Sequence, residues 1–93
     1  MAARRAITVE IHGDQWKIVK AKLRGCYGDC NYAKKRIRIH HTLTGTELMD
    51  TLLHELIHAR WPDIMETSVA EFATTLSSVL EQEGFSLPEA SNG

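Results

Sequence analysis

The sequence has little of several features that would assign it to a class directly. Its two cysteines, Cys26 and Cys30, are too few for a disulfide framework, and their C-x3-C spacing differs from the C-x2-C of structural zinc knuckles. We expect reduced, partly buried thiols. No apolar run approaches the roughly 20 residues of a membrane span. The start, Met1–Arg5, is followed by alternating residues rather than by the apolar block of a signal peptide. These absences predict a soluble, cytoplasmic protein with no membrane partner.

Length and composition are ordinary for a small globular domain. The chain has 93 residues, of which 43% are apolar and 25% are charged. A chain of this length holds one modest core, near the size at which a bound metal often adds stability. We therefore predict a single domain over residues 1–85, followed by a flexible tail over residues 86–93.

Charge is divided unevenly along the chain, although the net charge is −1. Residues 1–40 hold ten Lys or Arg and three Asp or Glu, whereas residues 41–93 hold one Arg and nine Asp or Glu. A basic half could bind nucleic acid or an acidic protein. We favour a solvated strand surface that faces acidic helices. A nucleic-acid partner ranks last, because the other half is acidic and only 6% of the residues are aromatic.

Alternating apolar and polar residues predict strands in the first half of the chain. The pattern is clear over Ile7–Ile11 and Arg36–His40. Over Trp16–Arg24 we predict a strand with an irregularity near Ile18 and its basic residues on one face, although Trp16, Val19 and Leu23 also fit a helical stripe. Turns or loops are expected at Gly13-Asp14, residues 25–29 and residues 32–35.

Two helices are predicted in the second half. The first runs from Gly45 to Arg60, begins with a capping box formed by Thr44 and Glu47, and stops before Pro62. The second is capped by Asp63, runs to about Glu83 and ends at Gly84. Their expected core residues are Leu48, Met49, Leu52, Leu53, Leu56 and Ile57, and then Met65, Val69, Phe72, Leu76, Val79 and Leu80. The fold class is α+β, with a small antiparallel sheet packed on both helices.

The most informative feature is the motif His54-Glu55-Leu56-Ile57-His58, which reads H-E-x-x-H inside the first helix. Residues four apart share a helix face, so both imidazoles can reach one zinc ion. Glu55 then lies beside the metal and can take a proton from a water molecule that the metal holds. A polar stripe on the same helix carries both histidines, and consists of Glu47, Thr51, His54 and His58.

A hydrolytic zinc site needs a third protein ligand, and no histidine follows His58. Ile64 stands where the longer H-E-x-x-H-x-x-G-x-x-H pattern would have its last histidine. An acidic ligand remains, and the second helix favours Glu66 over Glu71, because Glu66 flanks the core stripe and lies near the helix start. Glu66 could instead complete a capping box with its own helix. The candidates are therefore Asp63, Glu66 and Glu71.

Two further parts of a peptidase site stay open in the sequence. An oxyanion donor could come from Tyr27, Tyr32, His40 or His41. The strand Arg36–His40 is either an edge strand that pairs with an extended peptide or an internal strand. The sequence predicts a zinc-dependent metallopeptidase acting on a peptide or protein. The alternative is a non-catalytic, zinc-stabilised module for protein binding or regulation.

The segment Arg36–Ala59 resembles the minimal zincins, which include minigluzincins, SprT-like domains and short phage or bacterial metallopeptidase-like proteins. The stretch Gly28-Asp29-Cys30-Asn31-Tyr32 is also similar to what such proteins carry, and Glu66 with residues 69–73 is similar to the glutamate helix of gluzincins. The resemblance implies His54 and His58 as zinc ligands, Glu55 as general base and Glu66 as third ligand. SprT-like domains use a later histidine, which this chain does not have.

Overall fold

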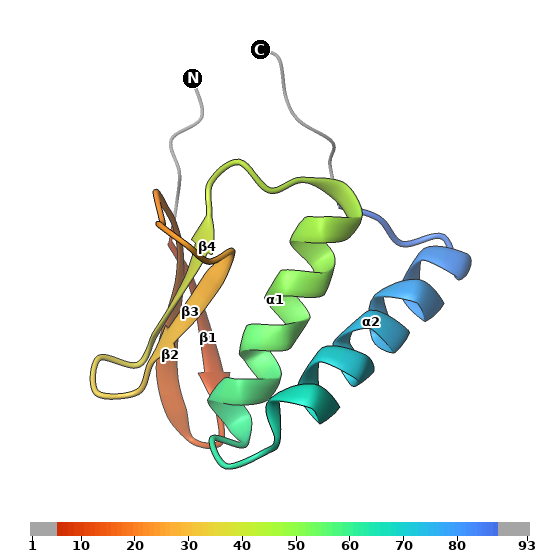
Figure 1. The fold of residues 1–93 in the computed structure, drawn as a ribbon. Coiled ribbons are helices and arrows are strands. Elements are labelled where there is room, and N and C mark those ends of the chain that lie inside the picture. The colour runs from red at the N-terminus through yellow and green to blue at the C-terminus, as the bar shows by residue number, and fades with distance from the viewer. Residues whose placement is uncertain (1–5, 88–93) are drawn as a thin grey trace.

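The computed structural model describes residues 6–87, which form a four-stranded sheet, a helix packed on one face of it, and a second helix on the far side of the first (Figure 1). The sheet has the order β1-β2-β4-β3, in which β2 and β4 are parallel and the outer pairs are antiparallel. The α+β class is confirmed, but the sheet is mixed rather than wholly antiparallel as predicted, because β4 returns between β2 and β3 and runs parallel to β2. The elements are β1 (Ile7–Ile11), β2 (Asp14–Ala21), β3 (Gly28–Asn31), β4 (Arg36–His40), α1 (Gly45–Arg60) and α2 (Glu66–Gln82).

Strand β2 confirms that this part of the chain is a strand, but its side chains are distributed over the two faces differently from the prediction. Trp16 and Ile18 are 3% and 7% exposed, so they set the face that meets the helices. The pairing with β4 runs from Lys17 to Ala21 without an irregularity. Lys20 pairs with Ile39 on the helix side, whereas Lys17 pairs with Arg36 on the other face. The basic residues of β2 therefore do not share one face, because burial of Trp16 and Ile18 determines which residues of the strand point towards the helices.

Strand β3 is an element that the sequence did not predict. The expected loop over residues 25–29 covers residues 22–27 instead, and Gly28 already belongs to the strand. Its residues, Gly-Asp-Cys-Asn, include no β-branched or aromatic side chain, so they carry no strand signal. Because β3 pairs outside β4, Arg36–His40 is an internal strand. Of the two alternatives that the sequence left open for Arg36–His40, the internal strand is confirmed and the edge strand is wrong, and β3 is the edge on this side of the sheet.

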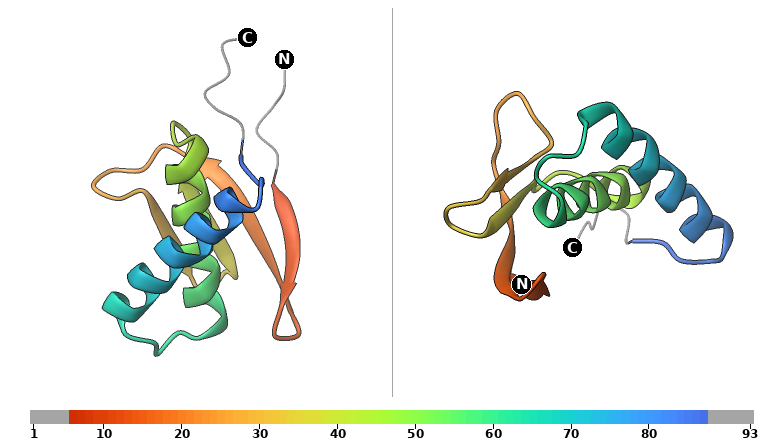
Figure 2. Two further views of the ribbon diagram at one scale, coloured as in Figure 1. Left: turned by 90° about the vertical axis from the view of Figure 1, so that its right-hand side faces the viewer. Right: turned by 90° about the horizontal axis from the view of Figure 1, so that it is seen from below.

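Helix α1 lies between two hydrophobic clusters, with the sheet on one side and α2 on the other (Figure 2). Leu48, Leu52 and Leu56 pack towards the sheet, and Leu53 packs towards α2. The sheet cluster consists of the buried residues Trp16, Ile18, Ile37, Ile39, Leu43 and Ala59. The α2 cluster is smaller and consists of Ile57, Val69 and Ala73.

Helix α1 has the predicted bounds but not the predicted capping box. Thr44 is the N-cap residue and its side chain makes no capping hydrogen bond. Gly45 has a φ of 55°, so the chain enters the helix through a left-handed residue. This entry differs from the regular first turn in which a cap hydroxyl reaches the third amide. The hydroxyl of Thr46 contacts the Glu81 carboxylate instead.

Helix α2 begins later than predicted and buries a different stripe. Met65, not Asp63, is its N-cap, because the chain first turns through residues 61–64, where the Ile64 amide donates to the Trp61 carbonyl. Gly84 ends the helix as predicted, with the Phe85 amide donating to the Leu80 carbonyl in a Schellman motif. Val69 is buried as expected. Three other expected core residues are at least half exposed, because small side chains at Ala73 and Ser77 make the close approach to α1: Met65, Phe72 and Val79.

Several predictions fall on the ends of the chain. Residues 1–5 and most of the predicted tail, residues 88–93, lie outside the described residues. The single-domain bounds of 1–85 therefore stay a prediction. Between residues 6 and 87, no helix combines the length and the apolar character that crossing a membrane requires.

Candidate metal centre

The two histidines of the motif project from the same face of α1, towards α2. Their ring centroids are 5.0 Å apart. Their side chains are 21% and 17% exposed, so each ring is largely enclosed but reachable from solvent. This is the arrangement that an i, i+4 pair on one helix dictates.

Glu66, the first residue of α2, meets both rings. Its Oε2 lies 3.0 Å from Nε2 of His54, and its Oε1 lies 2.8 Å from Nε2 of His58. One ligand atom from each of the three residues lies within 4.8 Å of the others. Glu66 is not held in a capping box with Asp63, because α2 begins at Glu66 itself. Its side chain is 68% exposed, so the carboxylate can be reached from solvent.

The donor set of these three residues suits a divalent transition metal. Two imidazole nitrogens and one carboxylate are a usual protein contribution to catalytic zinc, which keeps a further position open. Within residues 6–87 this is the one group of three or more His, Cys, Asp or Glu side chains that could hold a metal ion. Asp63 and Glu71, the other acidic candidates, are exposed and lie outside the group.

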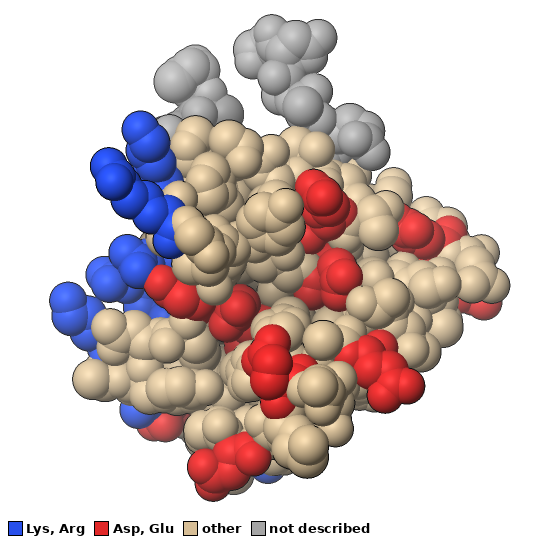
Figure 3. Space-filling model, viewed as in Figure 1, with Lys and Arg blue, Asp and Glu red and all other residues tan. Residues whose placement is uncertain are grey.

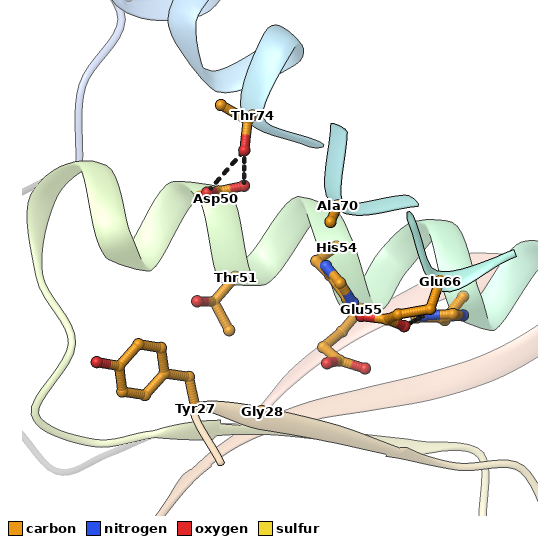
Figure 4. A pocket seen from close by; sticks show the side chains of 10 residues that line it. Tyr27, Gly28, Asp50, Thr51, His54, Glu55, Glu66, Ala70 and Thr74 are labelled. Carbon is orange, nitrogen blue, oxygen red and sulfur yellow. Dashed lines mark hydrogen bonds and ion pairs between the residues drawn. The ribbon is translucent and has the colours of Figure 1, made fainter. Parts of the chain in front are cut away.

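Glu55 points away from α2 and towards β3 (Figure 4). It is 7% exposed, which is unusual for a carboxylate. Burial raises the pKa of the Glu55 carboxyl, and the neighbouring rings of His54 and His58 lower it by a smaller amount. A raised pKa brings a carboxyl group closer to the range in which it both accepts and returns a proton near neutral pH.

Gly28 on β3 makes room for the Glu55 side chain. A Cβ atom at Gly28 would lie 3.2 Å from Cγ of Glu55, 3.0 Å from Cγ2 of Thr51 and 3.1 Å from the carbonyl oxygen of Arg38. These distances are closer than side chains normally approach. The absence of a side chain at position 28 therefore allows β3 to pack directly against the motif helix.

The end of α1 is fixed by a second contact with the sheet layer. The hydroxyl of Tyr32 donates a hydrogen bond of 3.0 Å to the main-chain carbonyl of His58. Burial is the main cause that raises the pKa of Tyr32 to about 12 and that of nearby Cys30 to about 11. Tyr32, a candidate oxyanion donor, is thus a protonated hydroxyl that supports the backbone of His58. Cys30 is a free, partly buried thiol as expected, whereas the free thiol of Cys26 is exposed.

An open cleft of about 440 Å³ runs along α1 and includes the three metal-binding candidates (Figure 4). Helix α1 forms its floor, α2 forms one wall, and Tyr27 and Gly28 form the other. Of the four candidate oxyanion donors, Tyr27 alone lines this cleft. The lining side chains of α1 and α2 follow helical spacing: Asp50, Thr51, His54, Glu55 and His58, and then Glu66, Ala70 and Thr74.

Sequence reasoning missed several residues of this cleft. Asp50 is four residues before His54, so the same spacing that relates His54 to His58 could have identified it. Ala70 and Thr74 continue the row that Glu66 begins on α2. Gly28 begins the stretch that resembles minimal zincins, but no local pattern links it to the cleft, because its contact is with a neighbour 27 residues later in the chain, Glu55.

Comparison with known proteins agrees with this architecture. Residues 2–66 match the SprT-like family, a segment that covers well over half of the chain and ends at the first residue of α2. No curated protein and no solved structure matches the chain. With the match extending over the sheet, the H-E-x-x-H helix and Glu66, this chain belongs to the SprT-like family.

Proposed function

We propose that this chain is a zinc-dependent peptidase in which His54, His58 and Glu66 hold the metal and Glu55 is the general base. The observation that carries the proposal is the convergence of two imidazoles and one carboxylate within 4.8 Å, beside a buried carboxylate on the same helix. Membership of the SprT-like family is compatible with such an activity. A structural zinc site is normally closed by four protein ligands. A set of three in an open cleft favours catalysis.

Each side chain has a distinct part in the proposed reaction. Zinc, when bound, supplies Lewis acidity that polarises a carbonyl group and makes a water molecule easier to deprotonate. The Glu55 carboxylate accepts the proton of the attacking water and returns it to the leaving amine. Burial of Glu55 against Gly28 restricts its rotamers, so the carboxylate is held at the floor of the cleft.

We further propose that an extended, unfolded peptide segment is the substrate, bound along β3. Strand β3 is at the edge of the sheet, and Gly28 lines the cleft beside Glu55. An edge strand offers unpaired main-chain groups to an added strand, as in β-augmentation. The cleft is open, with little material for deep side-chain pockets, which suits a flexible chain better than a folded one.

Metal analysis combined with peptide hydrolysis tests the proposal. The wild-type protein should bind zinc stoichiometrically. Glu66→Ala should lower zinc affinity at least about tenfold, because substitution of residues that only hydrogen-bond a metal ligand already lowers metal affinity by about that factor. Glu71→Ala, the same substitution on the same helix, should leave zinc affinity unchanged. Protein that takes up no zinc at micromolar levels would contradict the proposal.

A second substitution separates catalysis from metal binding. Glu55→Gln should keep the zinc and the fold but lower hydrolysis of an unstructured peptide about 10²–10⁴-fold, the usual contribution of a general base. Glu71→Gln is the matched control and should hydrolyse the peptide at the wild-type rate. Zinc-loaded wild type that hydrolyses no peptide would instead support the alternative, a zinc-stabilised module for protein binding.

A further inference from the structure

The cleft extends beyond the metal-binding candidates to a second polar group at its other end. Asp50 lies one helical turn before His54 on the floor of the same cleft, and Thr74 faces it from α2 (Figure 4). The Thr74 hydroxyl donates to Oδ2 of Asp50 over 3.2 Å. The half-buried carboxylate of Asp50 is therefore held in place by an uncharged partner, which leaves further acceptor sites on its oxygens.

The cleft around Asp50 is lined by acidic side chains and by no Lys or Arg side chain of residues 6–87. The charged residues that line it are Asp50, Glu55 and Glu66. Acidic side chains gather over the helices on the face that Figure 3 shows, while the basic side chains lie over the sheet. From residue 45 to residue 84 the sequence has eight Asp or Glu and one basic residue, Arg60. A metal ion held by His54, His58 and Glu66 would offset the charge of Glu66, whereas Asp50 is one helical turn from His54 and outside this group.

The wall opposite α2 adds a feature that suits a cation. Tyr27 lines the cleft and is 58% exposed, so its aromatic ring is available to a ligand. Aromatic faces attract Lys and Arg side chains. Thr51, between Tyr27 and Asp50 on the floor, is uncharged and small. Asp50 and His54 are four residues apart, which is about 6 Å along α1 at about 1.5 Å per residue. The long, flexible four-carbon stem of a Lys side chain suits a site set back from the metal-binding candidates by this distance.

We propose that this end of the cleft is a specificity subsite for a basic side chain, Lys or Arg, of the peptide substrate, with Asp50 as its anchor. The inference rests on the proposed function, since it assigns a substrate class to the same cleft. Asp50 would bind the cationic head, Thr74 would orient the carboxylate, and Tyr27 would cover the aliphatic stem. Peptides with an acidic residue at that position would be disfavoured by repulsion from Asp50.

Three unstructured peptides that differ at one position, Lys, Gln or Glu, test the proposal on the zinc-loaded protein. With the variable position scanned on both sides of the cleaved bond, kcat/KM should be about tenfold higher for Lys than for Gln at one position, the effect of a partly desolvated charge pair. Glu should be the poorest substrate there. Asp50→Asn should bring the Lys to Gln ratio to about one, and Asp50→Lys should make Glu preferred over Lys. Glu71→Lys, an equal charge change outside the cleft, should keep the wild-type ratios.

A binding measurement separates this inference from the proposed function. Fluorescence anisotropy of the same peptides on zinc-loaded Glu55→Gln protein reports affinity without hydrolysis. In one outcome, the wild-type protein hydrolyses no peptide, the Lys peptide still binds more tightly than the Gln and Glu peptides, and Asp50→Asn removes this difference. In that case the subsite stands and the peptidase proposal fails. If all three peptides are hydrolysed and bound alike, with no effect of Asp50→Asn, the subsite is overturned and the peptidase proposal stands.

Discussion

The two sides of α1 differ in how much apolar surface holds them. On the sheet side, Ile37 and Ile39 are fully buried in a cluster that includes Trp16. On the α2 side, Val69 and Ala73 are the buried apolar residues that α2 contributes, and the third buried residue, Ser77, is polar. Burial of apolar area is the main stabilising contribution to folding. The sheet side therefore stabilises the molecule, whereas the α2 side mainly orients Glu66, and the two should respond differently to substitution.

The largest effect is expected from Ile39→Ala on the sheet side. Ile39 is 0% exposed, and an Ile to Ala change in a core lowers the free energy of unfolding by about 2–5 kcal/mol. Urea denaturation measures this value. Ile7→Ala, the same change at a residue that is 57% exposed, is the control and should cost less than about 1 kcal/mol. Equal losses in the two variants would mean that the assigned core is wrong.

A smaller loss is expected from Gly28→Ala, where the sheet meets the site. The added methyl group would collide with Thr51 and Glu55, and overpacking of this kind costs about 1–3 kcal/mol. Displacement of Glu55 should also reduce peptide hydrolysis. Gly25→Ala serves as control, because Gly25 has a φ of 77° and nothing within 4 Å. Gly25→Ala should lose stability through backbone strain but keep its hydrolysis rate. Equal losses of activity in Gly25→Ala and Gly28→Ala would contradict a specific role of Gly28 in placing Glu55.

Val69→Ala probes the α2 side directly. Val69 is 0% exposed, and loss of its methyl groups should lower the free energy of unfolding by about 1.5 kcal/mol. Because Val69 is three residues after Glu66, zinc affinity measured by competition with a chelator should fall with it. Val79→Ala on the same helix, at a residue 50% exposed, should change neither quantity measurably. Unaltered zinc affinity in Val69→Ala would show that α2 does not orient Glu66.

The smallest effect should come from Cys30, which packs against the sheet cluster. Its pKa in the folded chain is about 11 against an ordinary 9.0, so the native state disfavours the thiolate. The free energy of unfolding should therefore fall as the pH rises from about 9 to about 11. Cys30→Ala should lose part of this pH dependence in denaturant titrations. Cys26→Ala leaves Cys30 in place and should keep all of it.

The same division between the two sides explains what the sequence could predict. The bounds of α1 and β4 followed from local periodicity, because α1 packs against both the sheet and α2, and β4 alternates between a buried and a partly exposed face. The buried stripe of α2 was partly wrong, because a helix with one covered side leaves Phe72 and Val79 exposed, and small residues make the contact. Strand β3 forms because it pairs with β4, and its own residues show no pattern that predicts this pairing.

The candidate site divides in a similar way. Helical spacing alone places His54, Glu55 and His58 correctly relative to one another, and it could have added Asp50. The meeting of Glu66 with both histidines depends on where α2 begins, which the capping signal at Asp63 misplaced. The enclosure of Glu55 by Gly28 depends on a distant strand. Chemistry that resides on one helix is predictable from sequence, and chemistry that joins two layers is not.

The connection between the helices is five residues long, from Trp61 to Met65. His54, His58 and Glu66 consequently fall within a segment of thirteen consecutive residues. Closing so short a loop costs little chain entropy, so the three side chains are at a high effective concentration relative to one another. Glu55 depends instead on a sheet partner encoded 27 positions earlier. The helical hairpin alone therefore brings His54, His58 and Glu66 together, whereas Glu55 becomes enclosed only when β3 has packed against α1.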